Sequence, residues 1–257
     1  MTTESRARSF SAAAERYADH RPSYPPVLFD TLAELAGFPQ AGALAADIGA
    51  GTGIATALLE ARGARVIGVE PGEGMAAEFR RRNPRTPLVR GDGNRLPLAS
   101  GCLDLLTYAQ SWHWTDPAHS VPEALRVLRP GGALAVWSND PDVTVGWIAD
   151  QQTRIEERFG PGWYLNERTR SQYGARFSHR RLPWSRRVPV DTHLAKLSTH
   201  SLFLVGEPGT DAFLAEERAL LIRQFPEGWV DERYVVDLSV AVRAPDGGEP
   251  GGDAGHG

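Results

Sequence analysis

Apolar and polar positions follow two different rhythms along the chain. Short, nearly continuous apolar runs have the length of buried strands, and the segments between them place apolar residues at helical spacing. The runs that predict strands are ALAADI (43–48), ARVIGVE (64–70), TPLVRGD (86–92), CLDLLTY (102–108) and ALAVWSN (133–139). Strands buried on both faces and separated by amphipathic helices are typical of a parallel sheet. We therefore predict a doubly wound α/β core over residues 40–140.

The helical segments have recognisable ends. Helices are predicted in PVLFDTLAELAG (26–37), ATALLEARG (55–63), GMAAEFRRR (74–82) and HSVPEALRVLRPGG (119–132). Gly37 and Gly63 are expected to stop the first two, and Pro130 the last.

The second half of the chain is less regular. The pattern predicts a helix at 145–160, a possible strand near 176–190, a helix at 211–225 and a final alternating strand at 232–243. We interpret these as the end of the same sheet with a helical insertion around 191–225. The last fourteen residues, 244–257, lack large apolar side chains and predict a disordered tail.

Composition narrows the function classes. The net charge of −4 disfavours a dedicated nucleic-acid or membrane-surface protein. No apolar run approaches the ~20 residues of a membrane span, and the first residues do not resemble a signal peptide, so we expect a cytoplasmic protein. Cys102 is the single cysteine, which excludes an internal disulfide. No carboxylate–histidine cluster suggests a metal, so none is expected.

The turn after the first strand reads DIGAGTGIA and carries Gly49, Gly51 and Gly53. In open α/β sheets, ligands lie beyond the carboxyl ends of the strands. A dinucleotide loop needs G-x-G-x-x-G or a final alanine, but counting from Gly49 the last position is Ile54. Asp47, at the end of the first strand, would place a negative charge beside the negatively charged pyrophosphate of a dinucleotide. A ligand with a cationic group therefore fits better than NAD.

Four motifs together resemble the class I S-adenosylmethionine-dependent methyltransferases, of the small-molecule, type 11 kind. They are DIGAGTG (47–53), VEPGEGM (69–75), GDGNRLPLASGCLDLLTYA (91–109) and LRPGGALAVW (128–137), in the family's order and spacing. The resemblance implies a Rossmann-like, seven-stranded, mostly parallel sheet with an antiparallel last strand. It also implies S-adenosyl-L-methionine as cofactor and one domain over residues 26–243.

The resemblance assigns matching positions to the cofactor. They are Asp47, Gly49, Ala50, Gly51, Gly53, Glu70, Pro71, Met75, Asp92, Gly93 and Gln110. Glu70 is expected to accept from both ribose hydroxyls, Asp92 from the adenine amino group, and Asp47 to lie near the ammonium. Met75 is expected against the adenine face. Solvated loop carboxylates at Glu70 and Asp92, and a core methionine at Met75, remain the alternatives.

The acceptor is expected over the end of the fourth strand, where AQSWHWTDP (109–117) follows. Gln110, Trp112 and His113 are the catalytic candidates, with His113 as a general base or a group that orients the acceptor. A histidine that merely packs there stays possible. Neighbours on extended backbone point in opposite directions, so one of Trp112 and Trp114 is expected in the core.

The stretch FSAAAERYADHRPSYPP (10–26) resembles a cofactor-covering lid of some of these methyltransferases, through Tyr17, Arg21 and Tyr24. We predict residues 1–25 as a helical lid segment, with a simple structural helix as the alternative. Arginines at 176, 180, 181, 186 and 187 alternate with aromatic residues at 163, 164, 173, 177 and 184. This stretch is either a solvated face or a substrate cap around 161–225.

The motifs favour methyl transfer to a small molecule, with a hydroxyl or carboxylate oxygen as acceptor. A nucleic-acid substrate is disfavoured, because the Asn/Asp-Pro-Pro-aromatic pattern of amino-group methylating enzymes is replaced by Gln110-Ser111-Trp112-His113. The alternatives are a non-methylating cyclisation or rearrangement with the same cofactor, and a regulatory protein with a degenerate pocket. A monomer or homodimer is expected.

Overall fold

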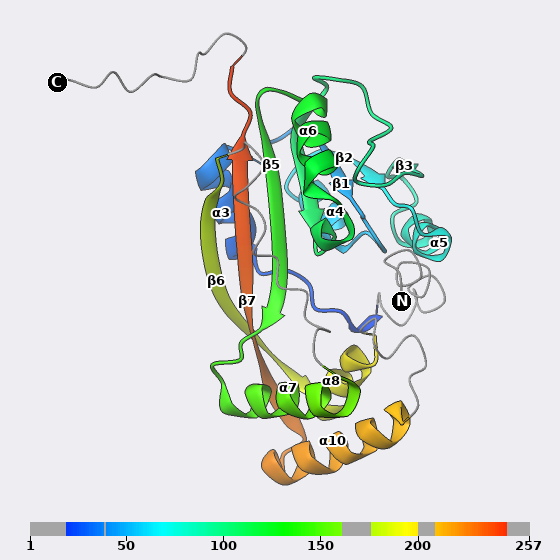
Figure 1. Cartoon of the computed structure of the whole chain (residues 1–257), viewed down its shortest axis with the longest axis vertical. Helices are drawn as coiled ribbons and strands as arrows, with labels where there is room; N and C mark the ends of the chain where they lie inside the picture. The colour runs from blue at the N-terminus through cyan, green and yellow to red at the C-terminus, as the bar shows by residue number, and fades with distance from the viewer. Residues whose placement is uncertain (1–18, 39, 161–175, 200–208, 246–257) are drawn as a thin grey trace, which may run out of the picture.

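One mixed sheet organises the part of the chain that the structure, a computed structural model, describes: residues 19–38, 40–160, 176–199 and 209–245 (Figure 1). Seven strands in these residues lie in the order β3-β2-β1-β4-β5-β7-β6. They are β1 (Leu44–Ile48), β2 (Arg65–Val69), β3 (Leu88–Val89), β4 (Leu103–Ala109), β5 (Leu128–Pro141), β6 (Ser178–Pro189) and β7 (Trp229–Val242). The first five are parallel, and β7 runs antiparallel to both β5 and β6. The predicted Rossmann-like sheet and its antiparallel last strand are confirmed.

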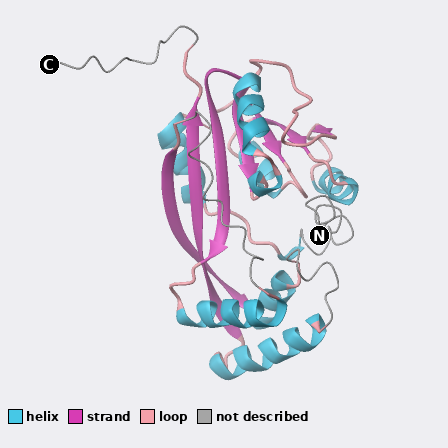
Figure 2. Cartoon of the chain, in the orientation of Figure 1, coloured by secondary structure: helices cyan, strands magenta, loops and turns pink. Residues whose placement is uncertain are grey.

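Helices cover the sheet and one of its ends. They are α3 (Pro26–Ala36), α4 (Ile54–Glu60), α5 (Glu73–Arg82), α6 (Pro117–Val127), α7 (Gly146–Phe159), α8 (Val190–Leu197) and α10 (Thr210–Gln224). A 3₁₀ turn, η1 (Trp112–Trp114), precedes α6. Figure 2 shows α7, α8 and α10 as a separate helical layer below the strands. The predicted insertion near 191–225 is therefore helical in the residues that the structure describes.

Alternating side chains of the strands enter two apolar clusters, one on each face of the sheet. Leu105 of β4 packs with Leu32 of α3 and Leu59 of α4 on one face. Its neighbour Leu106 packs with Val121 of α6 on the other. The near-continuous apolar sequence of these strands follows from this double burial.

Several predicted boundaries differ from the structure by a few residues. The third strand was predicted over 86–92, but only Leu88–Val89 pairs, on one side, with β2; Pro87 before it offers no N–H donor. The second predicted helix ends at Glu60 rather than Gly63. The helix predicted to reach Pro130 ends at Val127, and Leu128 is already extended. Pro130 disfavours helical backbone at Arg129, the residue before it, so the helix has to end before Arg129.

The strands β5, β6 and β7 extend beyond the carboxyl end of β4. Each has 12 to 14 residues, against seven in β4. Their far ends carry the helical layer, held by a small cluster of Val188, Val190, Leu194, Leu221 and Val230. The layer therefore faces the same edge of the sheet at which a ligand of an open α/β fold binds.

The predicted segments at the two ends of the chain lie largely outside the described residues. Residues 1–18 of the lid segment, with Tyr17, and residues 246–257 of the tail are among them. Within the described residues, no helix is long and apolar enough to span a membrane.

Candidate active site

The glycine loop between β1 and α4 is held against the end of β2. The backbone N–H groups of Gly49 and Ala50 both donate to the carbonyl of Val69, at 2.8 and 3.1 Å. Gly49 has φ +65°, and a Cβ there would lie 2.5 Å from Cβ of Ser111, so no other residue fits. Ser111, which donates to the Ile48 carbonyl at 2.5 Å, thus closes the loop from the β4 side.

Gly51 differs from its neighbours in the loop. Its φ is +57°, and the nearest atom to an added Cβ is a backbone oxygen 3.9 Å away. Gly53, by contrast, would meet Asn83 at 2.2 Å. The loop is therefore packed at Gly49 and Gly53 and open at Gly51. We call this open position at Gly51 the cradle, because a ligand can approach the backbone there.

Glu70 lies directly after β2 and connects two loops. Its side chain is buried, with Oε2 accepting from the Gly51 N–H at 2.9 Å and Oε1 from the Gly72 N–H at 2.6 Å. Burial raises the pKa of Glu70, while the bonds from Gly72 and Gly51 act in the opposite direction. The carboxylate is thus fixed beside the open glycine, although each oxygen retains a lone pair for a further donor.

The remaining predicted adenine positions lie in different surroundings. Met75 on α5 is buried. Asp92 is exposed, and its Oδ1 accepts from the Asn94 N–H at 2.7 Å. Gly93 is buried; its carbonyl accepts from the Tyr108 hydroxyl at 3.1 Å. Pro71 is exposed beside Glu70, and its carbonyl accepts from the Arg90 guanidinium. Ligand contact by these four positions stays a prediction.

Asp47 has an interior role that the sequence did not reveal. It is completely buried; Oδ2 accepts from the Thr56 hydroxyl at 2.7 Å, and Oδ1 from the Thr107 hydroxyl at 3.1 Å. Burial raises the pKa of Asp47 to about 6, against the effect of these hydrogen bonds. Both oxygens are already engaged, so the carboxylate joins β1, α4 and β4, and its predicted contact with a ligand ammonium remains untested.

Gln110 ends β4 in a strained conformation. Among the described residues, it is the non-glycine residue with positive φ, at +57°. Its N–H donates to the Trp137 carbonyl at 2.9 Å, and its Nε2 donates to the Asn139 carbonyl at 3.4 Å. Such outliers persist where the surrounding structure enforces them, and they are frequent at functional sites. The turn directs the chain away from β4 and into η1.

Trp112 packs as a core side chain. It is 3% exposed, and its ring meets Tyr108 edge to face at 4.7 Å. The prediction that one of the two tryptophans enters the core is thereby met, although the backbone is a 3₁₀ turn rather than the extended chain assumed. This packing argues against the catalytic role that the sequence assigned to Trp112.

His113 is half-buried at the same turn, with its ring 4.7 Å from that of Trp114. Burial lowers the pKa of His113 to about 4; the carboxylate of Asp140 works against this shift, and the guanidinium of Arg21 adds to it. The imidazole is therefore neutral at neutral pH. Arg21 of the segment before α3 and Asp140 of β5 both lie within electrostatic reach of the ring.

Arg21 links this turn to the helical layer. Its Nη2 donates to the carbonyl of Thr199, just beyond α8, at 3.5 Å. The structure thus brings the predicted lid residue Arg21 to His113, at the ligand edge of the sheet. Tyr24 packs instead beneath the sheet, edge to face with Trp137 at 5.6 Å.

The sequence missed the polar residues that hold the site together: Thr56, Thr107 and Ser111. Thr107 stands directly opposite Asp47 in the register of β1 and β4. Thr107 is a small polar residue inside an apolar strand, which is a signal that the sequence contains, but its partner depends on the pairing of distant segments.

Comparison with known proteins agrees with this geometry. Residues 46–136 match the family model described as a methyltransferase domain, Methyltransf_11. An uncharacterized methyltransferase of Mycobacterium tuberculosis is 40% identical over 142 residues, which make up 55% of this chain and 56% of that protein.

Two solved structures share the fold. A protein of Anaeromyxobacter dehalogenans, provisionally named a type II methyltransferase, has a TM-score of 0.66 and 26% identity, covering 87% of this chain and 97% of that one. A phosphoethanolamine N-methyltransferase of Haemonchus contortus, solved with phosphomonomethylethanolamine and S-adenosylhomocysteine, has a TM-score of 0.54 and 15% identity. The match covers 93% of this chain and 60% of that one.

Residues 46–136 thus form a methyltransferase domain of the class I, S-adenosylmethionine-dependent type, as the motifs predicted. The chain spans about half the length of the curated relative it matches.

Proposed function

We propose that the chain binds S-adenosyl-L-methionine at the edge formed by β1, β2 and β4 and transfers its methyl group to a hydroxyl oxygen of a small molecule. The observation that carries the proposal is the juxtaposition of Glu70 with the open Gly51 inside the matched domain. A bidentate acceptor beside an unobstructed loop suits the vicinal hydroxyls of a ribose.

The residues present fit this cofactor. Gly51 has space for a ligand, Glu70 keeps lone pairs for the ribose, and exposed Asp92 can accept from an adenine amino group. When bound, the cofactor supplies a methyl group on a sulfonium, which is already a good leaving group. The protein then contributes chiefly positioning, exclusion of water and a base.

His113 is the base in this proposal. Because its pKa is about 4, the ring is neutral and can accept a proton at neutral pH. A hydroxyl acceptor loses its proton as the new C–O bond forms, and the imidazole takes that proton. The strained turn at Gln110 places His113 beyond the end of β4, where the acceptor of an open α/β sheet is expected.

Cofactor binding is tested by titration calorimetry with S-adenosylhomocysteine. Glu70→Ala removes both ribose acceptors, and two charge-assisted hydrogen bonds support a loss of about a hundredfold in affinity. Glu73→Ala, on the exposed face of α5, is the matched control and should bind as the parent does. Unchanged affinity in Glu70→Ala would contradict the assignment.

Methyl transfer is tested separately, with a methyl-labelled cofactor and a panel of small phenols, alcohols and acids. We expect label in an ether product and one S-adenosylhomocysteine per turnover. Turnover of an acceptor without accumulation of S-adenosylhomocysteine would instead indicate the non-methylating rearrangement.

A further inference from the structure

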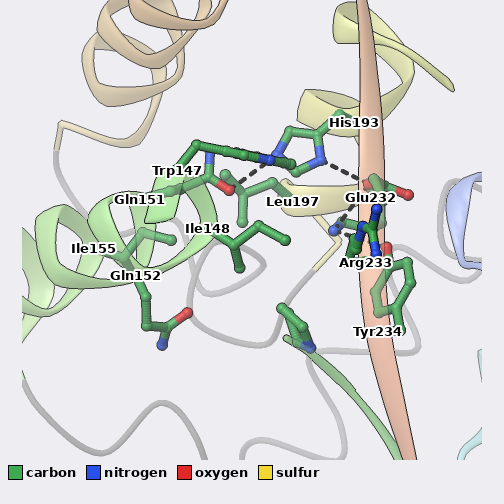
Figure 3. Close-up of a pocket in the computed structure, with 12 residues that line it drawn as sticks. Trp147, Ile148, Gln151, Gln152, Ile155, His193, Leu197, Glu232, Arg233 and Tyr234 are labelled. Carbon is green, nitrogen blue, oxygen red and sulfur yellow. Dashed lines mark hydrogen bonds and ion pairs between the residues drawn. The ribbon is translucent and has the colours of Figure 1, made fainter. Parts of the chain in front are cut away.

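A second polar centre lies in a pocket between the helical layer and the far ends of the long strands (Figure 3). α7, α8 and β7 contribute most of its lining. Trp147, Ile148 and Ile155 of α7 form one apolar wall, and Leu197 of α8 adds to it. A pocket with apolar walls and few polar groups is typical of small-molecule sites.

Lys196 and Glu232 form the polar end of the pocket. Lys196 is the only lysine in the chain and is 5% exposed. Its ammonium lies 3.1 Å from Oε1 of Glu232 and donates to the Tyr234 hydroxyl at 3.1 Å. An ammonium has three N–H donors, so one of them is left over after these two partners.

Glu232 does not neutralise this end of the pocket by itself. Its Oε2 is bound by Arg186 at 2.5 Å, and its Oε1 also faces Nδ1 of His193 at 2.6 Å. One carboxylate therefore serves two permanent cations, Arg186 and Lys196. Burial opposes a charge on Lys196, but Tyr234 and Glu232 outweigh it and raise the pKa of this lysine.

Glu217 of α10, a second buried carboxylate in the helical layer, is already paired with other residues. It accepts from Arg154 at 2.5 Å and from Gln151 at 2.9 Å. Arg233, which also lines the pocket, is an exposed cation at its rim and lies within electrostatic reach of Asp142. The pocket thus holds an excess of positive charge, and a buried surplus cation is costly unless an anion joins it.

The strand β5 connects the pocket with the turn that carries His113. Pro141 lines it, and the preceding residue, Asp140, is the carboxylate within electrostatic reach of His113. Trp184 stacks on Tyr234 at 5.1 Å and donates to Oδ1 of Asn139, whose carbonyl accepts from Gln110. The backbone of β5 covers roughly 13 Å between Trp137, which pairs with Ala109 at the end of β4, and Pro141, which lines the pocket.

We propose that this pocket binds the methyl acceptor and that the acceptor is a small organic acid with an apolar body. Its carboxylate accepts from the third N–H of Lys196 and from the Tyr234 hydroxyl, and its apolar body lies against Trp147, Ile148 and Leu197. The inference rests on the proposed function, and it gives that function a substrate class.

The carboxylate is the anchor rather than the methylated group. Its lone pairs are held by the ammonium and the phenol, which makes it a poor nucleophile. The hydroxyl at the opposite end of the molecule is the acceptor, and its proton passes to His113. A carboxylate suits the site better than a phosphate, because one ammonium donor and one hydroxyl match a single negative charge.

The test compares 3-(4-hydroxyphenyl)propanoate with its primary amide, which has the same shape and no charge. In titration calorimetry with S-adenosylhomocysteine present, we expect the acid to bind at least tenfold more tightly than the amide. Lys196→Met should remove this difference. The matched control, Arg180→Met, replaces an exposed cation of β6 and should keep it.

Tyr234→Phe provides a second variant, because it keeps the stacked ring and removes only the hydroxyl. It should lower the affinity for the acid several-fold and leave the affinity for the amide unchanged. This outcome can be measured whether or not Lys196→Met folds. Equal binding of acid and amide to the parent protein, or full affinity for the acid in either variant, would overturn the inference.

The same titrations separate the two proposals. Binding of S-adenosylhomocysteine without any preference for the acid overturns the acceptor class and leaves the proposed function intact. A preference for the acid that depends on Lys196, without binding of S-adenosylhomocysteine, overturns the proposed function and supports the anion site.

Discussion

Asp47 and Glu70 are buried carboxylates at the ends of adjacent strands, and they are stabilised in different ways. Glu70 accepts from two backbone N–H groups, whereas Asp47 accepts from two threonine hydroxyls. The sequence identified both carboxylates through their motifs. It could not predict how Asp47 is held, because Thr107 becomes its neighbour only through the pairing of β1 with β4.

Replacing Asp47 tests how much the buried carboxylate lowers the free energy of unfolding. The folded pKa of about 6 lies above the ordinary 3.8, so the folded state binds more protons than the unfolded state between these values. Stability therefore falls as the pH rises through this window. Asp47→Asn should stabilise the unliganded protein at pH 7, by up to about 3 kcal/mol less the cost of the hydrogen bond that Nδ2 of the asparagine cannot accept from a threonine hydroxyl. The gain should shrink towards pH 4 in urea melts, and a gain independent of pH would contradict the burial of an ionised Asp47.

His113 provides a pH test of the proposed base. Its pKa is lowered to about 4, so methyl transfer should stay constant from pH 8 to about pH 5 and fall only near pH 4. His113→Gln should lower kcat by about 10²–10⁴-fold and leave cofactor affinity unchanged. His119→Gln, on the exposed face of α6, is the control. An inflection near pH 6.5 that His113→Gln retains would show that a group other than His113 acts as the base.

At the scale of elements, the apolar strands were the easiest part to predict, and the segments around prolines the hardest. The cores of β1, β2 and β4 follow directly from continuous apolar runs. The early start of β5 at Leu128 depends on pairing with Leu103, a contact that the local sequence does not contain. The glycine loop was predicted by motif, but only the structure shows that Gly51 is open and that Gly49 is closed by Ser111.

The loop prediction is tested by two alanine substitutions of matched backbone cost. Gly51 and Gly42 both have positive φ, and an added Cβ has no close neighbour at either. Each alanine should destabilise the fold by about 1 kcal/mol. Only Gly51→Ala should also lower the affinity for S-adenosylhomocysteine, by at least tenfold, because its methyl group occupies the cradle. Equal affinities of the two variants in calorimetry would place the ligand elsewhere.

In the whole molecule, the groups that join the sheet to the helical layer are mostly ones that could not be predicted from the sequence. The insertion was predicted as helical, but its buried polar network was not. That network runs from Arg154 and Glu217 through Gln151 and His193 to Glu232. Every link joins residues at least 39 positions apart, so no local pattern could reveal it.

Substitution of Glu217 tests whether the helical layer unfolds independently of the sheet edge that holds the proposed cofactor site. Glu217→Ala leaves Arg154 and Gln151 without their buried acceptor, which should cost about 2–3 kcal/mol. Hydrogen exchange should then show faster opening of α7 and α10, while β1 and β4 keep their protection. Affinity for S-adenosylhomocysteine should be unchanged, since Glu70 and the glycine loop lie on the sheet.

Glu216→Ala, the exposed neighbour, should alter neither property. Loss of protection in β1 and β4 together with α7 and α10 would show instead that sheet and layer unfold as one unit.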